Sequence, residues 1–164
     1  HGPTPPAARH TTEADLWENL EYFLNEVGPV AEEAGVKLGL HPDDPPIGDV
    51  RGMPRIITSV DAYDRVLDIY DSEYNGVTFG QGNFAAMGVD IPETIRHFGD
   101  RINFVHFRDV KGPATDFVET WHDDGPTDMA APVKACNTPG RFTKTSSVTS
   151  SSTRSTGKWP SNLE

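Results

Sequence analysis

The sequence predicts an α/β protein with a parallel sheet, because segments of helical periodicity alternate with short apolar runs of strand length. Three such runs, at residues 36–40, 77–79 and 102–107, each follow a stretch whose apolar residues recur at helical spacing. The 164 residues are enough for one compact domain. Helix and strand in strict alternation place the strands side by side in one parallel sheet.

The first helix is expected after Thr12, which is a suitable N-cap, and Glu13 and Asp15 favour the positive end of the helix dipole. We expect Gly28-Pro29 to kink this helix and Gly35 to end it. Its apolar stripe recurs at spacings of one, three and four and consists of Leu16, Leu20, Phe23, Leu24, Val27, Val30, Ala31 and Ala34.

The remaining elements alternate in the same way. In chain order they are a helix at residues 61–70, a turn at Asn75-Gly76, a strand at 77–79, a helix at 91–98 with Pro92 in its first turn, and a strand at 102–107. Residues 53–58 form either a short strand or a loop. The prolines of the segment 41–46 forbid further pairing of the strand at 36–40.

Composition divides the chain into three segments. Residues 1–11 are rich in Pro and Ala and predict a flexible N-terminal segment rather than a signal peptide. Residues 12–135 hold the predicted α/β domain. Residues 136–164 are rich in Ser and Thr without apolar periodicity, so we expect a disordered tail.

The formal net charge of −11 argues against binding to nucleic acid or to anionic membranes. No apolar run approaches the roughly 20 residues of a membrane span. A single cysteine, Cys136, excludes an internal disulfide and suits a reducing cytoplasm. We therefore expect a cytoplasmic protein that binds neither nucleic acid nor membranes.

Two histidines lie at the ends of predicted strands, where parallel α/β folds place their functional groups. His41 closes the strand at 36–40, and His106 lies near the end of the strand at 102–107. Imidazole is a common ligand of divalent transition metals, so the two rings either converge on one metal ion or act as separate hydrogen-bonded side chains.

Other polar residues have two interpretations each. Arg108 either binds a substrate carboxylate through paired hydrogen bonds or pairs with a neighbouring acid. His122 either contacts substrate or belongs to a solvated turn. Asp43 and Asp44 either form a turn between the prolines or hold the metal-binding residues in place, and the turn is favoured. We find no nucleophile–base pair, so catalytic residues stay unassigned.

Four stretches, in order, resemble the mannonate dehydratase family. They are Leu40-His41-Pro42-Asp43-Asp44-Pro45-Pro46, the segment 75–83 that ends in Gln81-Gly82-Asn83, the segment 98–108, and His122 with Asp128-Met129. The resemblance runs from about Thr12 to Ala135. It implies a (β/α)8 TIM barrel of the xylose-isomerase-like type, of which this chain forms about half.

The resemblance also implies the reaction, which removes water from D-mannonate to give 2-dehydro-3-deoxy-D-gluconate in hexuronate breakdown. It implies Mn²⁺ or Fe²⁺ as cofactor, with His41 and His106 as two metal ligands. Asn83, Arg108 and His122 are then the candidate contacts to the sugar acid. The sequence does not decide whether the chain forms a homo-oligomer.

Two positions depart from the family pattern. The family has a cysteine ligand directly after its Thr-Phe strand, where this chain has Gly80. The aspartate ligand of the family's Pro-Asp-His motif is expected near Val148, inside the Ser/Thr-rich tail. We therefore favour an interrupted reading frame near residues 134–140. The alternatives to an active dehydratase are an inactive remnant and another metal-dependent sugar isomerase or epimerase of the same barrel class.

Overall fold

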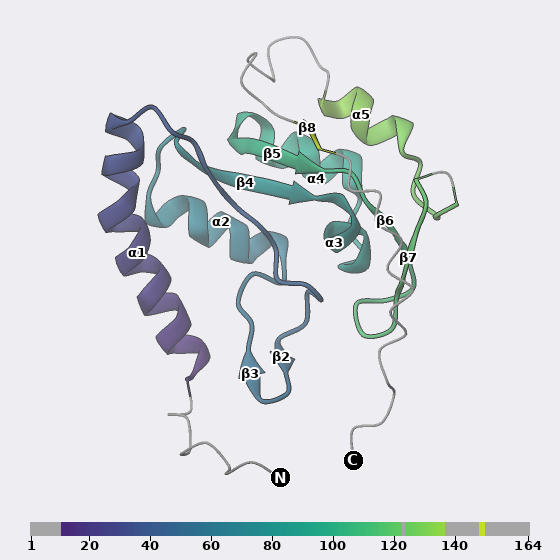
Figure 1. Ribbon diagram of the computed structural model, residues 1–164, viewed down its shortest axis with the longest axis horizontal. Coiled ribbons are helices and arrows are strands. Elements are labelled where there is room, and N and C mark those ends of the chain that lie inside the picture. Colours follow the sequence, from purple (N-terminus) through teal and green to yellow (C-terminus); the bar gives the residue numbers. More distant parts are fainter. Residues whose placement is uncertain (1–10, 123, 137–147, 150–164) are drawn as a thin grey trace.

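The structure is a computed structural model that describes residues 11–122, 124–136 and 148–149. These residues form one parallel sheet of four strands, in the order β1-β4-β5-β8, and two antiparallel ribbons (Figure 1). The sheet strands are β1 (Leu38–Leu40), β4 (Asn75–Gly80), β5 (Ile102–His106) and β8 (Val148–Thr149). The predicted α/β fold with a parallel sheet is confirmed.

The other elements connect and flank these strands. The ribbons pair β2 (Asp49–Val50) with β3 (Met53–Pro54), and β6 (Asp109–Lys111) with β7 (Val118–Thr120). The helices are α1 (Glu13–Glu33), α2 (Val60–Ile69), α3 (Gln81–Ala86), α4 (Ile91–Phe98), α5 (Ala130–Cys136) and the short 3₁₀ helix η1 (Gly99–Arg101). Within the described ranges, no helix has both the length and the apolar character that crossing a membrane requires.

Both ends of α1 form as the sequence predicts. Thr12 caps the start through a reciprocal pair of hydrogen bonds with Asp15, in which the Asp15 amide donates to the Thr12 hydroxyl at 3.2 Å and the Thr12 amide donates to the Asp15 carboxylate at 2.7 Å. At the other end Gly35 adopts φ +66°. The Val36 amide then reaches back to the Ala31 carbonyl oxygen at 2.8 Å, which closes the helix.

The buried face of α1 is narrower than predicted. Its buried residues are Trp17, Leu24, Gly28 and Ala31. Phe23 and Val30 were expected in the same stripe, but their side chains are 52% and 63% exposed. Each lies one residue, or about 100° around the helix, from a residue that packs on α2 and the sheet. That part of the prediction is wrong.

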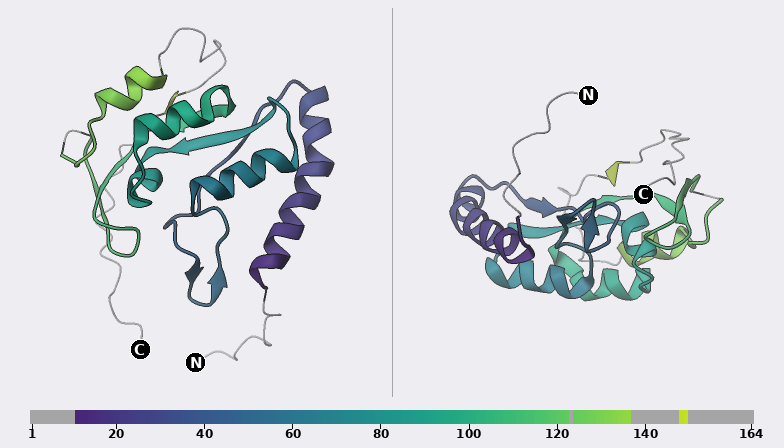
Figure 2. Two further views of the ribbon diagram at one scale, coloured as in Figure 1. Left: turned by 180° about the vertical axis from the view of Figure 1, so that it is seen from behind. Right: turned by 90° about the horizontal axis from the view of Figure 1, so that it is seen from below.

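One core lies between the helices and a single face of the sheet (Figure 2). Phe84 is at its centre and stacks on Phe79 of β4 at 4.3 Å between ring centroids. Its ring also lies 5.5 Å from that of Tyr63 on α2 and 5.9 Å from that of Phe98 on α4. Burying each such ring stabilises the fold by roughly 1.5–3 kcal/mol. This cluster fixes three helices relative to β4.

The pairing of β4 with β5 contains one irregularity. Val77 lies opposite Ile102, but Thr78 lies opposite Phe104, so Asn103 is an extra residue in β5. Beyond this bulge the register is regular again and places Gly80 beside His106 at the carboxyl ends of the two strands.

Several elements differ from the sequence-based expectation. Asn75-Gly76 begins β4 instead of forming a turn, because the buried Asn75 amide donates to the carbonyl oxygens of Val66 and Tyr70, both at 3.0 Å. The glycine-rich stretch after β4 forms α3. Of the two alternatives for residues 53–58, the short strand is present, as Met53–Pro54. Most of the predicted disordered tail lies outside the described residues, but Val148–Thr149 pairs with β5.

Candidate functional site

The site begins where β1 ends. The proline-rich segment after Leu40 stops the pairing, and the Tyr63 hydroxyl of α2 donates to the Leu40 carbonyl oxygen at 3.1 Å. Burial, and to a lesser degree the charge of Asp43, raise the pKa of Tyr63, so this hydroxyl remains a donor at physiological pH. The contact holds the backbone directly before His41.

The structure brings His41 and His106 together. Their ring centroids lie 5.0 Å apart with an angle of 50° between the ring planes. The Nδ1 atom of His41 lies 2.8 Å from the Pro42 carbonyl oxygen. A carbonyl oxygen only accepts, so Nδ1 carries the proton and Nε2 keeps its lone pair free, which is the tautomer suited to metal binding.

His106 lies in an environment that favours its neutral form. Burial, followed by the neighbouring His41 and Arg108, lowers the pKa of His106 from its usual 6.5. Its ring also packs edge-on against Phe104, at 5.0 Å between centroids. A neutral imidazole has a free lone pair, so the site holds two nitrogen atoms able to donate to a cation.

Gly80 lies between these rings and Asn83. A Cβ atom at position 80 would lie 2.9 Å from His41 Nε2 and 2.8 Å from Asn83 Oδ1. Glycine is therefore the residue that fits without moving either side chain. Any side chain at this position would project toward the free nitrogen of His41.

Arg108 joins three segments at the same edge of the sheet. Its Nη1 donates to Asp44 at 2.8 Å and to Glu119 of β7 at 3.1 Å, and its Nη2 donates to Asn83 Oδ1 at 3.4 Å. The sequence left open whether Arg108 pairs with an acid or binds substrate, and here it pairs with two acids. Both carboxylates are 37% exposed, so solvent screens these ion pairs and each contributes little to stability.

The other two candidate substrate residues lie close to Arg108. Asn83 is buried and donates to the Asp43 carbonyl oxygen at 3.3 Å. His122 donates through Nε2 to the Phe107 carbonyl oxygen at 2.8 Å. His122 is thus anchored beside Arg108, and its Nδ1 is the nitrogen left for another partner.

Asp43 supports the loop that carries His41. Its carboxylate accepts hydrogen bonds from the amides of Ile56 and Ile57 at 3.0 and 2.9 Å and from Arg55 at 3.0 Å. The favoured turn within Asp43-Asp44 is therefore replaced by contacts to residues 12–14 positions along the chain. Asp43 acts by positioning the loop.

The donor set for a metal ion is incomplete. In the ranges 11–122, 124–136 and 148–149, no group of three or more His, Cys, Asp or Glu side chains lies close enough together to hold one. Two imidazoles alone bind divalent ions weakly, because the ion loses hydration without gaining enough donors in exchange. The imidazoles of His41 and His106 therefore do not make a site that holds a metal ion tightly.

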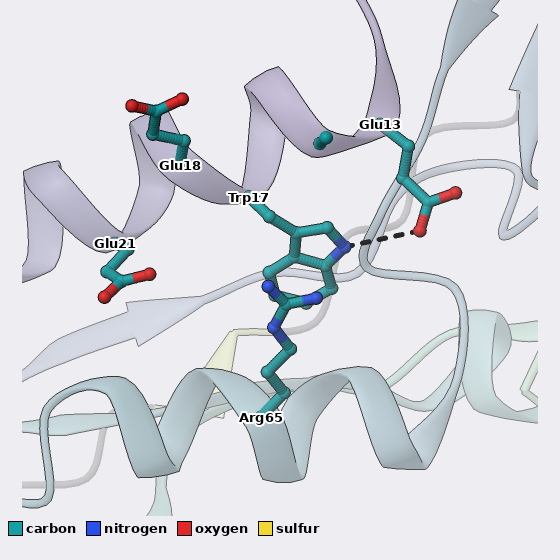
Figure 3. A pocket seen from close by; sticks show the side chains of 6 residues that line it. Glu13, Trp17, Glu18, Glu21 and Arg65 are labelled. Atoms are coloured by element: carbon teal, nitrogen blue, oxygen red, sulfur yellow. Dashed lines mark hydrogen bonds between the residues drawn. The ribbon is translucent and has the colours of Figure 1, made fainter.

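A surface hollow between α1 and α2 is separate from this site (Figure 3). The guanidinium of Arg65 lies over the Trp17 ring at 3.9 Å, and the indole nitrogen donates to Glu13 at 3.4 Å. Glu18 and Glu21 complete its polar lining. None of the predicted site residues lines it, and the Arg65–Trp17 contact explains how the two helices pack.

Sequence reasoning missed two acidic residues of the site region. Glu119 binds Arg108 from β7, and Asp109 is fully buried in β6. The Asp109 carboxylate accepts from the amide and hydroxyl of Thr127 at 3.1 and 2.7 Å, which holds the loop after His122. The β6–β7 ribbon has no strong apolar alternation, so its pairing left no signal in the sequence.

Comparison with known proteins identifies the family. The family model described as D-mannonate dehydratase (UxuA) matches residues 6–144, which extends beyond the end at Ala135 that the motifs indicated. The mannonate dehydratase of Shouchella clausii is 48% identical over 138 residues, covering 82% of this chain and 38% of that protein. That of Streptococcus suis is 46% identical over 131 residues.

Solved structures agree with this family assignment. The crystal structure of mannonate dehydratase from Streptococcus suis aligns with a TM-score of 0.72 at 45% identity, over 78% of this chain and 38% of that one. The IolI protein, whose structure holds a zinc atom, aligns with a TM-score of 0.62 at 20% identity, which supports the fold alone. The chain spans well under half the length of the mannonate dehydratases that it matches. The family predicted from the four motifs is confirmed, and the chain belongs to the D-mannonate dehydratase family.

Proposed function

We propose that this chain forms the C-terminal part of a (β/α)8 barrel that dehydrates D-mannonate to 2-dehydro-3-deoxy-D-gluconate. One observation carries the proposal: His41 and His106 converge at the carboxyl ends of two parallel strands, β1 and β5, that flank β4, with ring centroids 5.0 Å apart. Active sites of such barrels lie at this face. Because the chain covers about 38% of its relatives' length, the reaction belongs to the assembled barrel.

The reaction breaks the C2–H bond and the C3–O bond of the sugar acid, and the resulting enol becomes the 2-keto product. The substrate carboxylate needs a cationic partner near the reacting carbons. Arg108 suits this role, because its screened bonds to Asp44 and Glu119 exchange for a substrate carboxylate at little cost. Asn83 and His122 lie beside Arg108 and would contact the sugar hydroxyls.

The family's cofactor in this proposal is Mn²⁺ or Fe²⁺, held in part by the imidazoles of His41 and His106. A metal of this kind would stabilise negative charge on the substrate as the C2 proton leaves. The described residues provide only two donors, so we assign no catalytic step to the ion. We also assign no general acid or base.

Complementation tests the proposal. The purified chain is mixed with the part of the Streptococcus suis enzyme that lies outside the aligned region, and the 2-keto product is measured with D-mannonate and excess Mn²⁺. Because the chain provides only two metal donors and binds the ion weakly, we expect product from the mixture only in excess Mn²⁺, and none from either part alone. His41→Ala should abolish it, whereas His97→Ala should not, because His97 pairs with Asp64 on the helical face.

Two outcomes would contradict the proposal. Equal loss of product in His41→Ala and His97→Ala would mean that the strand-end pair has no special role. Turnover of aldoses but not of aldonates by the mixture would instead favour a sugar isomerase or epimerase of the same barrel class.

A further inference from the structure

Three neighbouring parallel strands of the sheet, β1, β4 and β5, end at one edge. His41 follows β1, Gly80 ends β4, and His106 ends β5. Gly80 is the register partner of His106, and register partners on parallel strands lie on the same face of a sheet. The ring of His41 lies 5.0 Å from that of His106, so the three positions meet at one point.

Only two of these positions carry a good metal donor. Position 80 faces the free nitrogen of His41, since a Cβ atom there would lie 2.9 Å from Nε2, but glycine has no donor to offer.

Charge adds to the deficit. A divalent cation at this point would be bound by two neutral imidazoles, with no anionic ligand from position 80 to balance it. The Arg108 guanidinium lies at the same edge and carries a further positive charge. A thiolate or carboxylate at position 80 would offset this positive charge.

We propose that this edge is a metal centre in which position 80, occupied by glycine, has lost its ligand. The isolated chain therefore does not retain a divalent ion, and a donor restored at position 80 creates binding that depends on His41. The inference rests on the proposed function for the kind of ion, and on the strand geometry for the positions.

Co²⁺ titration of the full chain tests this, with Cys136→Ser as the background so that an added thiol is the only one. The background chain should show no stoichiometric binding at micromolar Co²⁺. Gly80→Cys should bind one equivalent and develop thiolate-to-cobalt charge-transfer absorption. Loss of an outer-shell partner alone costs about 10–100-fold in metal affinity, so a gained direct ligand should tighten binding by about 100-fold or more.

Three controls make the result specific. Gly80→Ala adds the same crowding near His41 and Asn83 without a donor and should bind no ion. Gly48→Cys adds a thiol at an exposed position with open space around it and should not gain the absorption. Adding His41→Ala to Gly80→Cys should remove the gained binding.

The titration of the background chain needs no change at position 80, so it still tests the missing donor if Gly80→Cys fails to fold. Tight binding by the background chain, or gained binding that survives His41→Ala, would overturn the proposal. No sugar acid enters this titration, so its failure is separate from failure of the dehydratase assay.

Discussion

Replacing Asp43 with alanine should destabilise the protein by about 2–4 kcal/mol, although the side chain belongs to a loop. The carboxylate accepts from the Ile56 and Ile57 amides and from Arg55, and it is 19% exposed. Each amide left without a partner costs about 1–3 kcal/mol, and the amide of the half-buried Ile56 falls at the lower end. Arg55 is 37% exposed and regains water, so it adds little.

Urea denaturation followed by circular dichroism at pH 7 measures this loss. Asp43→Asn keeps one acceptor oxygen and should lose about half as much. Asp49→Ala is the matched control, because that exposed carboxylate accepts one bond from Gly52 in the β2–β3 ribbon. It should change the free energy of unfolding by less than about 0.5 kcal/mol. If Asp43→Ala cost no more than Asp49→Ala, the role given to this carboxylate would be refuted.

Three further predictions follow from burial and charge. The pKa of His106 is lower in the folded chain than in the unfolded one, so the free energy of unfolding should fall as the pH drops through 6.5. His41→Ala should raise the pKa of His106, which NMR titration measures. An unchanged pKa would contradict the electrostatic effect of His41 on His106. Phe84→Ala should cost about 3–5 kcal/mol in thermal unfolding, whereas the half-exposed Phe23→Ala should cost less than about 1 kcal/mol. Asn75→Ala should cost about 1–3 kcal/mol, because two carbonyl oxygens lose their donor; a cost equal to that of Phe23→Ala would argue against those bonds.

The elements with strong local signals were predictable from the sequence. Thr12 and Gly35 bound α1 as their capping chemistry requires, and α4 begins and ends where Pro92 and the apolar spacing indicate. The sequence left two alternatives for His41 and His106, and the structure has the one in which their rings lie together, because parallel strands bring their carboxyl ends to one edge. These features depend on residues close together in the chain or on a general rule of topology.

The features that the sequence did not predict depend on tertiary contacts. Asn75-Gly76 has the composition of a turn, but its side-chain bonds to the end of α2 draw it into β4. The stripe of α1 was predicted too wide, since periodicity alone does not tell which neighbours α1 will meet. Glu119 reaches Arg108 only because the β6–β7 ribbon folds back. No local pattern encodes such contacts.

The extra residue in β5 decides which side of the sheet His106 occupies. Ile102 and Val105 both pack in the core although they are three residues apart, an odd separation that a regular strand would place on opposite sides. In a regular strand of the same length, the even-numbered step from Ile102 to His106 would carry the imidazole among the helices. Asn103 takes up one residue outside the pairing, so Val105 faces the core and the imidazole of His106 lies on the other side of the sheet, with His41.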